Sequence, residues 1–190
     1  MKKISIVTPT FNEEENIERL CEEIKLVFKN LNYDYEHIVI DNNSTDSTIT
    51  KLRELAKNDK RLKVIINAKN YGHLKSPYYG ILQSSGDACI LMVSDFQEPI
   101  ELIPQYIKKW EQGSKIILCQ KNNSEENKIF FSLRKLFYYS INKISDTKLN
   151  INTSGTGLFD KEAINRLRKI NDPYPYFRGL VSELGFEIDT

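Results

Sequence analysis

Acidic and amide side chains follow three short apolar runs of the sequence, at positions where they can act together. Residues 9–13 follow the run at 4–8, residues 41–46 follow 38–40, and residues 94–99 follow 89–93. Carboxylates in such loops can accept hydrogen bonds from a base or a ribose, and clustered oxygen atoms suit a hard cation bound with a diphosphate. Each loop alone also fits a turn or a helix cap, but their agreement favours a nucleotide and cation site.

Strands and helices alternate along the first two thirds of the chain. Strands are expected at 4–8, 38–40, 62–66, 89–93 and 115–119, and amphipathic helices at 12–31, 46–57, 78–82 and 102–110. In the first helix, Asn12 is expected to be the N-cap. This order predicts an α/β fold with a mostly parallel sheet and right-handed crossovers. Ligands bind such sheets beyond the carboxyl ends of the strands, where the three polar loops fall.

Composition excludes several classes of protein. The 190 residues include 27 Lys and Arg against 26 Asp and Glu, a net charge of +1 that gives no support for a nucleic-acid binder. Mean hydropathy is −0.46, and no apolar run reaches the length of a membrane span. No signal peptide is expected, and three distant cysteines predict buried thiols of a cytosolic protein. The aromatic-rich segment 129–144 predicts a helix that packs in the core, or that meets a membrane surface or further parts of the protein.

Several enzyme motifs are absent from the sequence. It has neither a dinucleotide fingerprint nor a P-loop, and G-x-S-x-G is missing, so a hydrolase triad lacks support. His37 lies inside a strand and is expected to be structural, whereas His73 on a loop is expected to face the site. A sugar-phosphate nucleotidyltransferase is a rival interpretation, but it calls for a glycine-rich basic loop where acidic residues follow the first strand.

Six motifs, in this order and spacing, together resemble the family 2 glycosyltransferases. They cover nearly the whole chain: Ile6–Ile17, Val39–Thr48, Asn70–His73, Ser85–Asp87, Ser94–Pro99 and Phe177–Leu180. The resemblance is strongest to the branch of dolichol-phosphate mannose synthase and bacterial polyprenyl-phosphate glycosyltransferases. It implies one catalytic domain over 1–190 with a GT-A, Rossmann-type fold that binds a nucleotide sugar.

The resemblance also assigns roles to particular residues. It implies that Asp95 and Gln97 approach a Mg²⁺ or Mn²⁺ ion and the diphosphate, with Glu98 beside them as a further catalytic candidate. Positive charge near the phosphates or the acceptor is expected from Lys75, Arg134 and Arg178. The nucleoside is expected to contact six residues, Pro9, Phe11, Glu13, Asp41, Asn70 and His73.

The sequence departs from the family pattern at three places. Val93 replaces the first acid of the Asp-x-Asp metal motif, which weakens the expected metal site. Gly155 stands where the branch has an acidic residue that can serve as base, so Glu98 and Asp160 are alternative bases. Related chains continue into membrane-associated segments, whereas this sequence stops at Thr190 and is expected to be truncated.

The sequence therefore predicts transfer of a sugar from a nucleoside diphosphate, UDP being favoured, with inversion at the anomeric carbon implied by the resemblance. The expected acceptor is a polyprenyl phosphate or a growing cell-surface glycan, because an ionised phosphate needs no base at Gly155. The alternative is a degenerate domain that binds nucleotide sugar without transfer. The expected location is the cytoplasmic face of the membrane, and self-association into a homo-oligomer is also expected.

Overall fold

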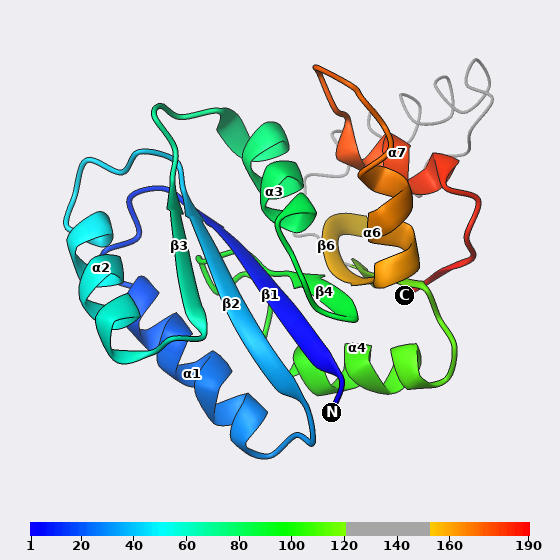
Figure 1. Ribbon diagram of the computed structural model, residues 1–190, viewed down its shortest axis with the longest axis horizontal. Helices are drawn as coiled ribbons and strands as arrows, with labels where there is room; N and C mark the ends of the chain where they lie inside the picture. The colour runs from blue at the N-terminus through cyan, green and yellow to red at the C-terminus, as the bar shows by residue number, and fades with distance from the viewer. Residues whose placement is uncertain (121–152) are drawn as a thin grey trace, which may run out of the picture.

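The chain folds into a mixed sheet flanked by helices on both faces (Figure 1). The structure, a computed structural model, describes residues 1–120 and 153–190. The strands are β1 (Lys3–Thr10), β2 (Asp34–Asp41), β3 (Leu62–Ile66), β4 (Ala88–Leu91), β5 (Ile116–Gln120), β6 (Thr153–Asp160) and β7 (Ile188–Asp189). The helices are α1 (Ile17–Lys29), α2 (Thr48–Asn58), α3 (Gly72–Leu82), α4 (Leu102–Glu111), α6 (Lys161–Leu167) and α7 (Phe177–Glu183).

The order of the described strands across the sheet is β3-β2-β1-β4-β6-β5-β7. β1 runs parallel to β2 and β4, and β2 runs parallel to β3, as the alternating pattern predicts. β6 is antiparallel to β4, with Gly157 opposite Leu91. The beginning of β6 therefore lies at the same edge of the sheet as the carboxyl ends of β1, β2 and β4. We call this edge the carboxyl edge.

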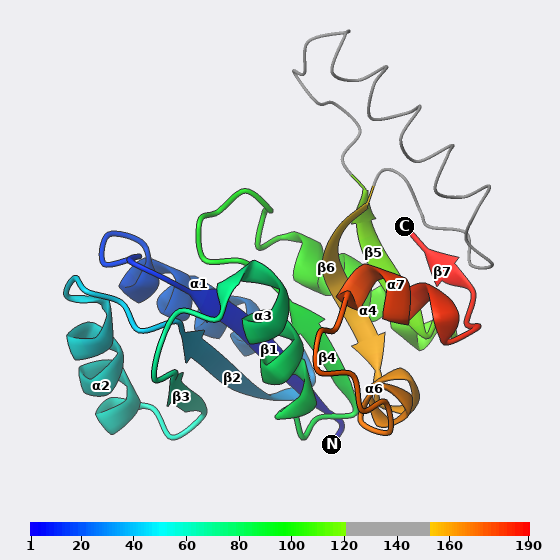
Figure 2. The same ribbon diagram turned by 90° about the horizontal axis from the view of Figure 1, so that it is seen from above.

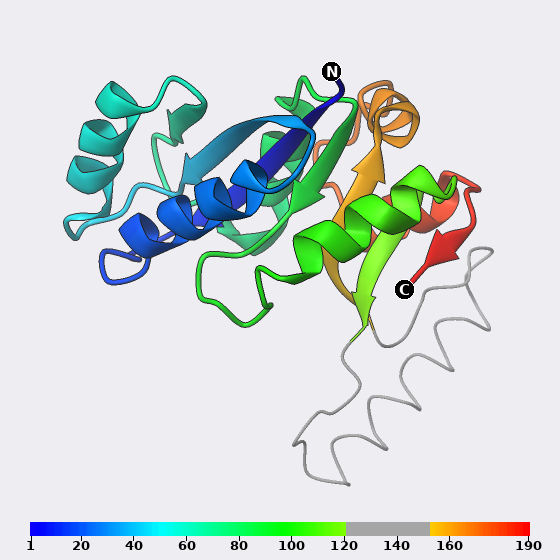
Figure 3. The ribbon, with the colours of Figure 1, turned by 90° about the horizontal axis from the view of Figure 1, so that it is seen from below.

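Alternating side chains of the strands feed two cores, one on each face of the sheet. Ile4 and Ile6 of β1 pack in the cluster with α1, α2 and α4, whereas Val7 packs in the cluster with α3, α6 and α7. Figure 3 shows α1 and α4 across one face, and Figure 2 shows α3 and α7 across the other. Both faces of the central strands are buried, which explains the continuous apolar run in β4.

Two expected boundaries near Pro9 are wrong. β1 continues through Pro9 to Thr10, since β4 has ended beside it and the Pro9 carbonyl accepts a hydrogen bond from Ser94 Oγ at 3.4 Å. α1 begins at Ile17 with Asn16 as its N-cap, so Asn12 does not cap it. Asn12 has a φ of 54°, a left-handed conformation that cannot start a right-handed helix.

The cysteines agree only partly with the expectation of buried thiols. Cys89 is fully buried, whereas Cys21 and Cys119 are half-buried, and none of the three forms a disulfide. Burial raises the pKa of both Cys21 and Cys89 to about 12, so neither thiol ionises near neutral pH. The helix expected at 129–144 lies outside the described residues.

Candidate functional site

The loops that follow β1 and β2 are joined by hydrogen bonds at the carboxyl edge. The Asn12 backbone N–H donates to Ser44 Oγ at 2.8 Å, and Thr45 N–H donates to Asn12 Oδ1 at the same distance. One residue further along, Glu13 N–H donates to Thr48 Oγ1 at 2.9 Å. Side chains of one loop thus satisfy backbone groups of the other, so the two loops form one preorganised unit.

Asp41, at the end of β2, stabilises the loop that follows this strand. Its side chain is completely buried and accepts hydrogen bonds from Ser44 N at 2.8 Å and from Ser44 Oγ at 2.5 Å. Asn42 extends the network, because its Oδ1 accepts from Asn67 Nδ2 at 3.0 Å and from Tyr71 N at 3.3 Å. The loop before α3 is therefore tied to the same edge of the sheet.

Backbone strain is concentrated at this edge. Among the described residues, the non-glycine positions with positive φ are Asn12 (54°), Asn43 (65°) and Phe96 (56°). Each follows a different strand, β1, β2 or β4, and such conformations cost free energy that the rest of the fold must supply. The buried Thr10 hydroxyl at the end of β1 has no hydrogen-bond partner. Strain and an unpaired hydroxyl together make this edge the candidate binding site.

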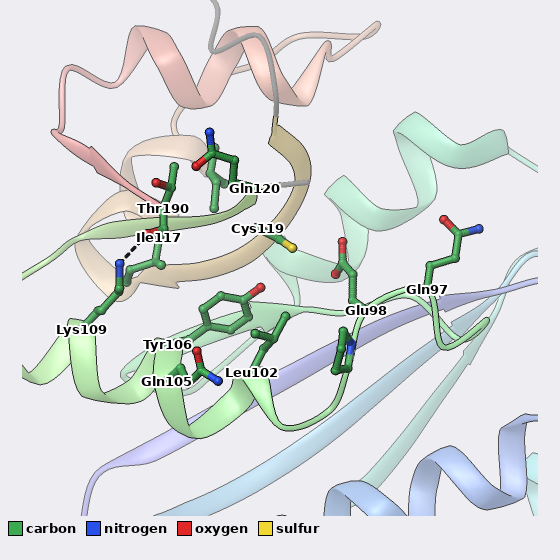
Figure 4. A pocket seen from close by; sticks show the side chains of 12 residues that line it. Gln97, Glu98, Leu102, Gln105, Tyr106, Lys109, Ile117, Cys119, Gln120 and Thr190 are labelled. Carbon is green, nitrogen blue, oxygen red and sulfur yellow. Dashed lines mark hydrogen bonds between the residues drawn. The ribbon is translucent and has the colours of Figure 1, made fainter. Parts of the chain in front are cut away.

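The loop after β4 contains the residues predicted to approach a metal. Asp95 and Gln97 are exposed, and Asp95 Oδ1 accepts a hydrogen bond from Gln97 N at 3.1 Å. Glu98 is buried and accepts a hydrogen bond from Thr156 Oγ1 of β6. Glu98 and Gln97 also line one end of a cavity of about 410 Å³ that extends between α4 and β5 (Figure 4).

The donor atoms of this loop fit a divalent cation only in part. Carboxylate and amide oxygens are suitable ligands for Mg²⁺ or Mn²⁺, and Asp95 and Gln97 both reach solvent. The described part of the chain contains no group of three or more His, Cys, Asp or Glu residues arranged to hold a metal. Val93 is half-buried and brings no ligand atom. The residues therefore fit a cation whose remaining ligands come from a diphosphate and water.

Arg178 of α7 lies over Gly155 at the start of β6. A Cβ placed on Gly155 would lie 3.1 Å from Arg178 Nε, and the φ of Gly155 is +83°. The Arg178 side chain thus lies in the space where an acidic side chain at position 155 would extend. Since Thr156 binds Glu98, the structure brings Arg178, Gly155 and Glu98 to one part of the carboxyl edge.

Asp160 is too far from this edge to act as a base there. It pairs with Ala88 at the beginning of β4, accepts from Trp110 Nε1 at 2.7 Å, and caps α6 through Glu162 N. Burial alone would raise the pKa of Asp160, but these hydrogen bonds and Lys115 lower it below its ordinary value. The expectation that Asp160 is an alternative base is therefore wrong, and its role is structural.

The other residues predicted for the site differ in exposure. Phe11 is exposed and Pro9 half-buried, both at the end of β1, while Glu13 Oε2 accepts from Asn16 Nδ2 at 2.8 Å. Asn70 is exposed just before α3, where its Oδ1 accepts from Gly72 N at 2.7 Å. His73 is also exposed, but it lies in the first turn of α3 and not on a loop as expected. Lys75, in α3, contacts the ring of Tyr174. Arg134 lies outside the described residues.

His37 has the structural role expected of it. It is buried, its Nε2 lies 3.0 Å from Thr8 Oγ1, and burial lowers its pKa to about 4. Sequence reasoning did not single out Thr10, Asn42, Ser44, Thr48 or Thr156. Four of these belong to motifs used for the resemblance, but only their contacts distinguish them from ordinary turn and cap residues.

Comparison with known proteins identifies the family. The model of glycosyl transferase family 2 matches residues 5–168, and the chain belongs to this family. A bactoprenol glucosyl transferase of Shigella phage SfV is 29% identical over 189 residues, which are 99% of this chain and 62% of that enzyme. The chain thus spans less than two thirds of the length of the curated relatives it matches.

Two solved structures share the fold. The mannosyltransferase PcManGT of Pyrobaculum calidifontis, in complex with GDP-Man and Mn²⁺, has a TM-score of 0.61 at 16% identity, covering 100% of this chain and 54% of that one. S. aureus TarS 1–349, in complex with UDP-GlcNAc, has a TM-score of 0.56 at 18% identity, covering 95% and 53%. These likenesses confirm the expected GT-A fold. No helix among the described residues is long and apolar enough to cross a bilayer.

Proposed function

We propose that this chain transfers a sugar from a nucleoside diphosphate sugar to a polyprenyl phosphate. The observation that carries the proposal is the preorganised carboxyl edge, where the loops after β1, β2 and β4 present exposed polar groups on a strained backbone. Family membership and the bactoprenol glucosyl transferase among its relatives support the same activity. UDP is the favoured nucleotide, inversion at the anomeric carbon the favoured outcome, and the cytoplasmic membrane face the favoured location.

Each group of residues has a distinct task in this proposal. The joined loops at residues 9–13 and 41–45 receive the nucleoside, with Phe11 exposed to contact the base or ribose. Asp95 and Gln97 would hold a divalent cation, which when bound would offset negative charge that grows on the leaving diphosphate. Arg178 supplies further positive charge from the opposite side of the edge, beside Gly155.

The absence of an acidic side chain at Gly155 favours an acceptor that is already ionised. A hydroxyl acceptor needs a base, and Glu98 is the remaining acidic candidate; it is buried against Thr156. A phosphate monoester is largely anionic at neutral pH and attacks without losing a proton to the protein. Arg178, next to Gly155, offers a cation to such a phosphate.

The second candidate function is binding of a nucleotide sugar without transfer, favoured by Val93 and Gly155. Labelled UDP-glucose, Mn²⁺ and the chain, incubated with undecaprenyl phosphate in detergent or with soluble sugars, separate the two functions. Labelled lipid supports the proposal. Product on soluble sugars alone refutes the lipid acceptor, and nucleotide binding with neither product nor donor hydrolysis favours the binding domain.

A further inference from the structure

Exposed tyrosines gather on one part of the surface. Among the described residues, nine large apolar or aromatic side chains are exposed, and five of them lie on α3, on the residue before it, or in the segment before α7. We call these five residues the tyrosine surface: Tyr71, Leu74, Tyr79, Tyr174 and Tyr176. Tyr174 is the most exposed of them, at 78%. Such a gathering calls for an explanation that scattered exposed residues do not need.

Two lysines lie against aromatic rings of the tyrosine surface. Lys75 Nζ lies 4.2 Å from the centre of the Tyr174 ring, which joins α3 to the segment before α7 (Figure 1). Lys69 Nζ lies 5.3 Å from the centre of the Tyr71 ring. Tyr71, Lys75 and Tyr79 also line a shared cavity of about 410 Å³ beside β3. Lys75 therefore lies beside three members of the tyrosine surface, Tyr71, Tyr79 and Tyr174.

The charge of this region differs from that of the remaining chain. Residues 66–83, which include α3 and the segment before it, contain Lys69 and Lys75 and no Asp or Glu. The net charge of the chain is +1, so the other residues together carry −1. The acidic side chain of Asp172 borders the tyrosine surface, and its Oδ1 accepts a hydrogen bond from Tyr174 N at 2.8 Å. The region is thus a local positive patch on a nearly neutral protein.

We infer that the tyrosine surface docks onto the headgroup layer of an anionic lipid bilayer. Tyrosine rings are favoured at the boundary between hydrocarbon and water, and lysines near the surface are attracted to anionic lipids. A protein partner of ordinary composition would not by itself explain tyrosines combined with a segment that lacks acids. The inference rests on the proposed function, because a polyprenyl phosphate acceptor resides in a membrane.

The position of the tyrosine surface agrees with this role. The backbone N–H of Tyr71 donates to Asn42 Oδ1, so the surface begins where the loop after β2 ends. A bilayer contacting α3 would therefore lie next to the carboxyl edge. Docking would bring a lipid phosphate to the donor site without requiring the whole acceptor to leave the membrane.

Sedimentation with vesicles of phosphatidylcholine, with or without 30% phosphatidylglycerol, measures this docking. The wild-type chain is expected to bind the anionic vesicles. Combined Leu74→Ala, Tyr79→Ala and Tyr174→Ala changes should lower the partition coefficient at least about tenfold, and Lys69→Glu about fivefold or more. The matched controls are Leu26→Ala, exposed on α1, and Lys57→Glu, exposed on α2. Both controls should bind as the wild type does.

Three results would overturn the inference: no binding to anionic vesicles, equal losses for Lys69→Glu and Lys57→Glu, or concentration-dependent dimerisation that the triple variant abolishes without any vesicle binding. UDP binding in the absence of lipid, measured by calorimetry, distinguishes this failure from failure of the proposed function. If the wild type binds UDP but not anionic vesicles, only the docking surface is refuted. If the wild type does not bind UDP, the donor site itself is refuted.

Discussion

The two edges of the sheet use polar side chains in opposite ways. At the amino edge, Glu36 is buried and accepts hydrogen bonds from Ser5 Oγ (2.6 Å), Ser85 N (2.7 Å), Ser85 Oγ (2.8 Å) and Lys63 Nζ (2.5 Å). Gly86 N–H donates to the same Ser5 hydroxyl at 2.9 Å. Every partner belongs to the protein, so this network joins β1, β2, β3 and the turn before β4 and leaves nothing for a ligand.

At the carboxyl edge, the polar groups are held in place but left open. Asn12, Asn43 and Phe96 have strained backbones, and Asp95 and Gln97 are exposed. The internal hydrogen bonds there, such as those from Ser44 to Asp41, shape the loops without covering them. The comparison indicates that motifs of similar polar composition stabilise the fold at one edge and are left open at the other, where we propose that the donor binds.

The largest expected effect is on stability, from Glu36→Gln. Burial alone would raise the pKa of Glu36, but hydrogen bonds from Lys63, Ser5 and Ser85 lower it to about 2. Because the pKa of Glu36 is lower in the folded protein than in the unfolded chain, the ionised carboxylate stabilises the fold. This stabilisation is complete above a pH of about 4.5 and is lost as the pH falls toward 2. Urea unfolding at pH 7 should show a loss of roughly 3 kcal/mol, with UDP affinity of the folded protein unchanged.

The control for Glu36 is Glu23→Gln, which breaks an exposed pair with Arg19. Surface pairs contribute about 1 kcal/mol or less. Equal losses of unfolding free energy for the two variants, or a loss of UDP affinity in Glu36→Gln, would contradict the division between the edges.

The next effect is on nucleotide binding, from Asp41→Asn. The amide NH2 that replaces Asp41 Oδ2 cannot accept the hydrogen bond from Ser44 Oγ, so the loop proposed to receive the nucleoside should loosen. UDP affinity should fall by about 1–3 kcal/mol in calorimetry. Asp34→Asn, at the exposed amino end of the same strand, should leave UDP affinity unchanged. If the Asp41→Asn variant binds UDP with wild-type affinity, Asp41 is not part of the donor site.

A smaller effect is expected on metal-assisted binding, from Asp95→Asn. The increase in UDP affinity caused by Mn²⁺ should fall by roughly tenfold, because a charged ligand becomes neutral. Glu101→Gln, exposed just before α4, should retain the full increase. Val93→Asp should enlarge it by adding a carboxylate beside Asp95. If Asp95→Asn and Glu101→Gln behave alike, Asp95 only shapes its loop.

The smallest effect concerns the strained backbone at Asn43. With a φ of 65°, Asn43→Gly should gain about 0.5 kcal/mol of unfolding free energy, whereas Asn43→Ala should lose about 1 kcal/mol. Asn30 has a φ of −100°, so the control Asn30→Ala should not lower the free energy of unfolding by this amount. Urea titration measures all three variants, and identical stabilities of Asn43→Gly and Asn43→Ala would show that position 43 stores no strain.

Most of the fold up to β5 followed from the sequence, because burial on both faces gives strands such as residues 88–91 an unbroken apolar pattern. The region after Gln120 was harder. β6 begins with Thr, Ser and Gly residues and pairs antiparallel between β4 and β5, a placement that no local pattern indicates. The sequence therefore predicted the sheet but not the strand that brings Gly155 and Arg178 to its carboxyl edge.

The candidate site was likewise predicted as a set of loops rather than as contacts. The sequence indicated Asp41 and Asp95 by their places after strands, and both lie at the expected edge. It could not show that Asp41 is held by Ser44, nor that Asp160 lies at the other edge with Trp110. Such contacts depend on strand register and on side chains far apart in sequence, which periodicity does not encode.

The most direct measurement of the central claim is a titration of the ¹⁵N-labelled chain with UDP and Mg²⁺, followed by amide chemical shifts. The account predicts that the largest shifts lie in residues 9–13, 41–45 and 93–98, with little change at Glu36, Ser85 and Gly86. Shifts centred on the amino edge, or no saturable shifts at the carboxyl edge, would contradict the assignment of the donor site.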